Sequence, residues 1–336
     1  MAKKAENREE KSQAPAEIKY LSVDALADLI QRANAEGGRF CFVLGSGASV
    51  ESGIPDGKKL EMDWMNCLMG EANDQDAAAC DPRMVEEWAR SLQSDGRMKN
   101  SFEELKEEWE KAKAKGERTL SSDYYSDIYR LRFFTNRSNG YRYLERIMEK
   151  AQPSIGYHTL SLLMTKDNSN NLLITTNFDS LVEDALAIYS EKRPLVIAHE
   201  SLADYMDVDT SRPIIAKVHR GLFFEPLNTT EETDKLHENW KPALRNAFRR
   251  YAPIVIGYAG GDQSLMAFLE EPDTQMKQGL FWCIREGSEP SERIKELVRA
   301  KGGCFVRIPG FDGMMMQLGV AMFEDEFVPN GTRELL

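Results

Sequence analysis

The sequence predicts an α/β fold, with a mostly parallel sheet, helices on both of its faces and an inserted helical module. Three observations support this prediction. Short apolar segments alternate with helical patterns, several of these segments run into glycine-rich or polar turns, and a charged stretch of helical period separates the first segment from the rest. Strands that are covered on both faces are continuous apolar runs, as these segments are.

The first elements are a helix and a buried strand. Residues 22–36 carry one apolar stripe, and Gly37-Gly38 is expected to end that helix. The strand Phe40–Leu44 follows and leads directly into a glycine turn. Residues 1–19 are charged and have no apolar core, so we expect a disordered leader before the domain.

Residues 58–150 differ in character, because they are charged and helical in period. Ser101-x-x-Glu104 is a capping box ahead of an apolar face that includes Trp109. We therefore predict a helical insertion at 58–150, between two parts of one domain at 20–57 and 151–325. Its charged faces are most simply solvated surface, and a surface that docks a partner is the alternative.

The second part of the domain returns to short strands and helices. Strands are expected at residues 172–175, 195–198, 214–218, 254–257, 281–284 and 304–308. Helices are expected between several of them, at residues 179–189, 242–250 and 291–300.

The composition excludes several classes of protein. The 336 residues contain 43 Lys and Arg against 55 Asp and Glu, and the net charge of −12 argues against a broad nucleic-acid interface. No apolar run of about 18 residues indicates a membrane span, and the N-terminus lacks the apolar core of a signal peptide. No two of the five cysteines have C-x-x-C spacing, so we expect no zinc module, no metal and a cytoplasmic protein with reduced thiols.

The strongest motif is G-S-G-A-S-V-E-S-G-I-P-D at residues 45–56, directly after the first strand. Glycines there allow backbone N–H groups to approach a phosphate, at the strand ends where open α/β sheets bind ligands. Val50 replaces the third glycine of the dinucleotide fingerprint, and no P-loop lysine follows. A glycine pair after a strand is also compatible with a structural turn, but the Ser-Gly-Ile-Pro tail makes this motif more specific.

Two further strand ends carry polar side chains. Asn177 and Asp179 follow the strand at 172–175, where they point into a ligand crevice or cap the next helix. His219 ends the strand at 214–218, where it serves as a general base or as an ordinary structural histidine.

A fourth strand end has the sequence I-G-Y-A-G-G-D at residues 256–262, and its simplest interpretation is a tight βα loop. All four strand ends would open on one edge of one sheet. Together they predict a nucleotide site that contains an asparagine, an aspartate and a histidine.

These motifs resemble the sirtuin superfamily. G-x-G-x-S-x-x-S-G-I-P at 45–55, T-x-N-x-D at 175–179, K-x-H at 217–219 and G-Y-x-x-x-D at 257–262 stand in the family's order, and Tyr157-His158 begins a helix like the family's. The resemblance implies a Rossmann-like fold and covers about residues 20–58 and 153–320. It is strongest to the bacterial sirtuin-like NADases of anti-phage defence.

Three departures separate the chain from the protein deacylases of that superfamily. The cysteine pairs of the deacylase zinc module are missing. Gly57 stands where the family has an aromatic residue after Ile-Pro-Asp. Arg220 interrupts the usual His-Gly pair, and this affects the segment that helps to build the acyl-peptide channel of deacylases.

The resemblance implies an NAD+ glycohydrolase that releases nicotinamide and ADP-ribose. Asn177 would hold the ribose and the attacking water, His219 would be the general base, and Asp179 would hold the nicotinamide carboxamide. The diphosphate would lie on the loop after the first strand, Ser52 to Pro55 would form a mobile lid, and Tyr258 and Asp262 would lie on the adenosine side. The full set of NAD+-binding residues is Gly45, Ser46, Gly47, Ala48, Ser49, Ser52, Gly53, Ile54, Pro55, Thr176, Asp179, Gly257, Tyr258 and Asp262.

A free NADase would kill its host, so the resemblance also implies a regulated, NAD-depleting effector. We expect a homo-oligomer, with the helical insertion as the surface for self-association or for a HerA-type ATPase, an Argonaute-type protein or a phage protein. A non-enzymatic sensor of NAD or ADP-ribose is the first alternative, and an NAD-dependent protein deacylase or ADP-ribosyltransferase is the second.

Overall fold

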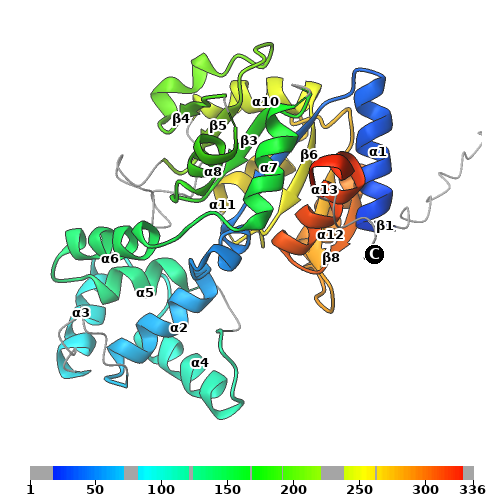
Figure 1. The fold of residues 1–336 in the computed structure, drawn as a ribbon. Coiled ribbons are helices and arrows are strands. Elements are labelled where there is room, and N and C mark those ends of the chain that lie inside the picture. The colour runs from blue at the N-terminus through cyan, green and yellow to red at the C-terminus, as the bar shows by residue number, and fades with distance from the viewer. Residues whose placement is uncertain are drawn as a thin grey trace, which may run out of the picture.

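The computed structural model describes residues 18–71, 82–120, 124–166, 169–190, 192–220, 238–261 and 263–327. Figure 1 shows a sheet covered by helices and, at the lower left of the view, a group of helices that projects from one end of it. Of the expected leader, residues 1–17 lie outside the described residues, and Lys19 already belongs to a strand.

The sheet has eight strands in the order β1-β8-β7-β6-β2-β3-β5-β4. All described pairings are parallel, which confirms the predicted fold class. The strands are β1 Lys19–Leu21, β2 Phe40–Leu44, β3 Leu172–Thr175, β4 Leu195–Ile197, β5 Ile214–Lys217, β6 Ala252–Ile256, β7 Phe281–Arg285 and β8 Cys304–Ile308.

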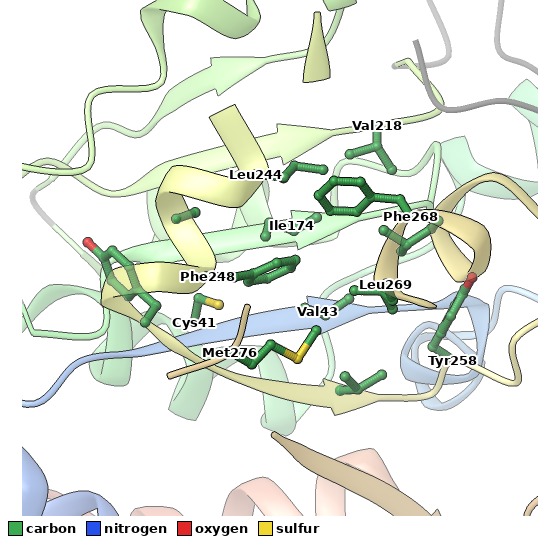
Figure 2. Close-up of a cluster of buried hydrophobic side chains, with 14 of the residues drawn as sticks. Cys41, Val43, Ile174, Val218, Leu244, Phe248, Tyr258, Phe268, Leu269 and Met276 are labelled. Carbon is green, nitrogen blue, oxygen red and sulfur yellow. The ribbon is translucent and has the colours of Figure 1, made fainter. Parts of the chain in front are cut away.

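Alternate residues of β2 enter two separate cores. Phe40 and Phe42 pack on one face of the sheet, against the helices α1 Val23–Ala35, α7 Ile155–Thr165, α8 Leu181–Tyr189 and α13 Phe311–Phe327. Cys41 and Val43 face the other core (Figure 2). This core is covered by α10 Trp240–Arg250, α11 Gln263–Glu270 and α12 Glu292–Ala300. The β2 side chains are fully buried, as the continuous apolar run predicts.

Two strands differ from the prediction by more than one residue at an end. β1 was not expected, because three residues beside a charged segment give no measurable apolar pattern. β6 begins at Ala252, two residues before the expected start, although Pro253 has no N–H for the ladder. Ala252 N donates to Arg39 O, on the β2 side of the strand. The backbone nitrogen of the next residue, Pro253, therefore faces the β7 side. Proline is compatible with this position because β7 pairs with β6 only from Ile254 onward.

The segment between β2 and α7 folds as helices with a core of their own. These are α2 Gly57–Leu68, α3 Pro82–Ser94, α4 Phe102–Ala114, α5 Tyr125–Arg132 and α6 Arg137–Glu149, here called the helical module. Trp64 lies at its centre, with its ring 5.2 to 6.0 Å from the rings of Tyr125, Tyr129, Phe133 and Tyr143. The predicted capping box at Ser101 and Glu104 is confirmed.

The helical module contacts the sheet domain close to a strand end. Phe178, which lies between Asn177 and Asp179, packs against the module's core. Ile147 and Met148 at the end of α6 contact both this core and the core beside α7. None of the helices among the described residues has the length and apolar character needed to cross a membrane.

Candidate functional site

The four strand ends singled out in the sequence lie in one row. Leu44 is opposite both Thr175 and Ile256, and Thr175 is opposite Lys217. The chain leaves β2 toward β3 on one side and later returns to β6 on the other, so the strand order reverses at β2. Such a reversal at the carboxyl edge is where open α/β sheets form their ligand crevice.

The loop after β2 is packed tightly against the loop after β6. Gly45 N donates to Ile256 O and Gly47 N donates to Gly257 O, at 3.0 and 2.9 Å. Gly257 has a φ of +65°, and a Cβ there would lie 2.3 Å from the N of Ala48. These three glycines therefore allow the two loops to meet. The first loop continues as two short 3₁₀ turns, η1 Ser46–Ala48 and η2 Val50–Ser52, with Ser46 exposed.

Ser49 links three elements through its hydroxyl, which is buried. Its Oγ donates to Asp179 Oδ2 at 2.8 Å and lies 3.1 Å from Asn177 Nδ2 and 3.2 Å from the Tyr157 hydroxyl. A serine has one proton to donate, so the asparagine and the tyrosine are the donors in the other two bonds. The hydroxyl is fully used inside the protein, and it holds the strand ends together without facing solvent.

The side chain of Asn177 has a defined orientation. Its Nδ2 lies 3.1 Å from Gly45 O and 3.1 Å from Ser49 Oγ. Because a carbonyl oxygen only accepts, the atom that faces Gly45 O must be the amide nitrogen. Both N–H groups are thereby used, and the acceptor Oδ1 of this half-buried residue takes part in neither bond.

Asp179 is part of a buried cluster with Lys217 and Glu183. The Lys217 ammonium donates to Asp179 O at 2.5 Å and pairs with Glu183 Oε1 at 2.6 Å. Asp179 Oδ1 also accepts from Leu181 N, the first residue of α8, at 3.2 Å, whereas the N-cap position is held by Ser180, whose side chain makes no capping bond. Burial raises the pKa of Asp179 and of Glu183, although Ser49 and Lys217 oppose this. Two carboxyls against one ammonium make the cluster acidic.

His219 lies at the end of β5, beside β3. Its Nε2 is 3.0 Å from the hydroxyl of Ser264, and both side chains are buried. Arg220 follows in the left-handed backbone region and forms two hydrogen bonds with the carboxylate of Glu200. Burial acts to raise the pKa of Glu200, but the bonds and charge of Arg220 outweigh it and leave that pKa below its usual range.

The segment expected to act as a lid is tied to α7. Ser52 Oγ accepts from Ser154 N at 3.0 Å, immediately before that helix. Gly53 ends η2 with a φ of +90°, and Ile54 is buried in the core beside α7. Its N–H donates to Ser49 O at 3.2 Å. These contacts hold the segment next to the strand ends.

The other expected residues are placed less uniformly. Tyr258 lies in the core beside β7 (Figure 2). Its ring is 5.8 Å from that of Trp282. Thr176 is half-buried at the end of β3, with its N–H 3.3 Å from Leu44 O. Asp262 lies outside the described residues.

Four supporting side chains were missed as participants in the sequence analysis: Tyr157, Glu183, Glu200 and Ser264. Glu183 carries a signal, because it lies four residues after Asp179 in a helix that begins at the strand end. Glu200 and Ser264 carry none, since nothing in their surroundings relates them to a histidine 19 or 45 residues away. Among the described residues, no group of three His, Cys, Asp or Glu side chains is placed to hold a metal ion.

The fold and site define an open parallel α/β protein with polar side chains gathered at the reversal of strand order. Residues 171–304 match the SIR2-like domain, in agreement with the resemblance to the sirtuin superfamily that the motifs indicate. Among solved structures, a crystal structure of a Sir2 homolog–NAD complex is 15% identical, with a TM-score of 0.38 over 88% of this chain and 94% of that chain. No curated protein gives a significant match.

Proposed function

We propose that the chain is an NAD+ glycohydrolase. In this reaction, the bond between the ribose C1′ and the nicotinamide nitrogen breaks, and the electron pair leaves with nicotinamide. A water oxygen bonds to C1′, its proton passes to a base, and the products are nicotinamide and ADP-ribose. Nicotinamide is a cation before it leaves, so no general acid is required. The protein has to orient the substrate, stabilise positive charge on the ribose and position a water.

The orientation of Asn177 is the observation that carries the proposal. With its nitrogen bound to Gly45 O and Ser49 Oγ, the side chain has Oδ1 as the atom with which it would bind a ligand. An acceptor in that position binds the hydroxyl of a ribose or a water molecule, and a fixed acceptor orients what it binds. A side chain used only to cap a helix would not need this orientation.

The acidic cluster supports the same chemistry. Asp179 is connected to Asn177 by two hydrogen bonds through Ser49, and it shares the cluster with Glu183 and Lys217. Glycosidic bond cleavage develops positive charge on the sugar ring. A carboxylate close to the ring would stabilise that charge in a poorly screened environment.

His219 supplies the base in this proposal. It lies two residues after β5, as Asn177 lies two residues after β3, and the last residues of these strands are opposite each other, so the two side chains belong to neighbouring strand ends. A histidine accepts a proton near neutral pH, here from water or from a ribose hydroxyl.

The remaining contacts to NAD+ are assigned to the loops after β2 and β6. Ser46 is exposed in the first 3₁₀ turn, where its hydroxyl and the neighbouring backbone are suited to the diphosphate. Gly53, Ile54 and Pro55 border the nicotinamide half, and Tyr258 with Asp262 borders the adenosine half. Ser49 and Asp179 contribute through their mutual hydrogen bond as well as through any contact to the ligand.

The physiological role we propose is regulated NAD+ depletion in anti-phage defence. The helical module would carry the contacts of a homo-oligomer or of a partner protein, as expected from its charged faces. Phe178 connects the module's core with the site, because it lies between Asn177 and Asp179. A strict monomer that is fully active, measured by light scattering and NAD+ turnover, would contradict this regulatory part.

The test is a chromatographic time course of NAD+ with the purified chain. We expect nicotinamide and ADP-ribose from the wild type, and a rate about 10²–10⁴-fold lower from Asn177→Ala and from His219→Ala. Asn34→Ala is the matched control, because Asn34 lies in α1, away from the strand ends. Folded Asn177→Ala and His219→Ala variants that turn over NAD+ at the wild-type rate would contradict the proposal.

The two alternative functions give different results in the same assay. Tight NAD+ binding without turnover, in the chain alone and in any complex that it forms, would identify a sensor. Nicotinamide release that requires an acylated peptide or a protein acceptor would identify a deacylase or an ADP-ribosyltransferase.

A further inference from the structure

The backbone is strained directly after His219. Arg220 has a φ of +67°, and it is the only residue other than glycine with a positive φ among the described residues. The side chain of an L-residue crowds its own backbone in this region, which glycine adopts freely. Strain of this kind persists where surrounding contacts enforce it, and it concentrates at functional sites.

The contact that enforces it is a two-point ion pair. Arg220 Nε donates to Glu200 Oε2 at 3.0 Å, and its terminal nitrogen donates to Oε1 at 2.6 Å. Glu200 is only 8% exposed and begins the short helix η3 Glu200–Tyr205 after β4. The planar guanidinium fixes both the distance and the angle between the two residues.

The same turn encloses His219. Arg220 N donates to Lys217 O at 3.1 Å, so the backbone closes a turn around Val218 and His219. One end of the turn is held by β5 and the Lys217 ion pair with Glu183, and the other end by the Arg220 ion pair with Glu200. The imidazole leaves this turn toward Ser264.

We propose that Arg220 and Glu200 are positioning residues, which hold the His219 imidazole in place at the carboxyl edge of the sheet. This inference rests on the proposed function, in which His219 is the base. A glycine at position 220 would adopt the backbone without strain, so the backbone alone does not explain an arginine there. The arginine is explained by its side chain, which fixes the end of the His219 turn that lies away from β5.

The test compares Arg220→Gly, Arg220→Lys and Glu200→Gln. Arg220→Gly keeps a backbone that suits the turn but removes the ion pair, so it separates positioning from strain. We expect kcat for NAD+ cleavage to fall by about 10- to 100-fold in Arg220→Gly and Glu200→Gln, with KM within about twofold. Arg220→Lys restores a single-point pair, and its kcat should lie between those of Arg220→Gly and the wild type.

The matched control is Arg293→Lys, which makes the same change in the two-point pair of Arg293 with Glu270 between α12 and α11. It should leave kcat at the wild-type value. The double variant Arg220→Gly with Glu200→Gln should lose no more than the single variants, because both remove one interaction.

A second measurement does not depend on turnover. The imidazole NMR signals of His219, assigned by their absence in His219→Gln, should move in Arg220→Gly and Glu200→Gln and stay in place in Arg293→Lys. If the wild type does not cleave NAD+, the proposed function fails and these signals alone decide the positioning role. His219 signals that do not move would overturn the inference, and so would a folded Arg220→Gly variant with wild-type kcat.

Discussion

The turns after β3 and β5 lie side by side but are held in different ways. After β3, Asn177 donates to Gly45 O, and Asp179 accepts from the Ser49 hydroxyl and from Leu181 N, so several hydrogen bonds fix this turn. After β5, the turn has a strained residue and depends on charged side chains at both ends, Lys217 at one and Arg220 at the other.

This difference separates two ways of preparing a site. Where several neutral or singly charged hydrogen bonds hold a turn, the loss of one of them reduces the stability only a little, because the others remain. Where a buried ion pair holds a turn, the loss of one partner reduces the stability strongly, because the other partner is left as an uncompensated charge. The β3 turn should therefore tolerate single changes that the β5 turn does not tolerate.

The largest effect is expected from Lys217→Met, which breaks the link between the two turns. The change leaves Glu183 and Asp179 buried without the ammonium, and the free energy of unfolding should fall by about 3–5 kcal/mol. Denaturant unfolding measures this. Lys241→Met is the control, because Lys241 pairs with Glu238 and Glu271 near the surface, and its loss should cost below about 1 kcal/mol. If the two variants lose the same free energy of unfolding, the buried ion pair is no more important for stability than the surface pair.

The second prediction tests how far the β3 turn depends on the packing of the loop after β2 against the loop after β6. Gly257→Ala places a Cβ 2.3 Å from Ala48 N at a residue with positive φ. Strain and overpacking together should cost about 2–4 kcal/mol in unfolding free energy. Gly287→Ala has a φ of +79° and nothing within 4 Å of the new Cβ, so it measures the backbone cost alone. If Gly257→Ala lowers the free energy of unfolding no more than Gly287→Ala does, the two loops can move apart without cost.

The third effect removes one bond from the β3 network. Tyr157→Phe deletes the donor to Ser49 and leaves the bonds from Ser49 to Asp179 and from Asn177 to Ser49. We expect a loss of about 1 kcal/mol by thermal unfolding. Tyr251→Phe removes the bond from another buried hydroxyl to Asn171 and should cost about as much, with NAD+ turnover unchanged. A loss of NAD+ turnover as large as that of Asn177→Ala would contradict the distributed network.

The smallest expected effect is a change of stability with pH. It is small because Ser49 and Lys217 oppose the burial that raises the pKa of Asp179. A raised carboxyl pKa means that the folded state binds the proton more tightly. Its contribution to stability is therefore complete below the ordinary value of 3.8 and is lost as pH rises through the folded-state pKa. The Tm of Asp179→Asn, relative to the wild type, should rise over that interval. A relative Tm that falls as pH rises would give the pKa shift the opposite sign.

Much of the sheet domain could be predicted because its information is local. A continuous apolar run such as Phe40–Leu44 is buried on both faces wherever it lies, and the polar residues that follow each strand lie at one edge once the strands are parallel. The helical module was predicted as helical, but its packing around Trp64 was not, because periodicity identifies a face and not its partner.

The sequence by itself determined the α/β class, the parallel strands and the positions of Asn177 and His219 at strand ends. Only the tertiary structure decided what those residues contact: that Ser49 faces inward, that Lys217 joins the two turns, and that Glu200 holds Arg220. The physical reason is range. Strand and turn preferences act between neighbours along the chain, whereas hydrogen bonds and buried charges depend on distances that exist only after distant segments have packed.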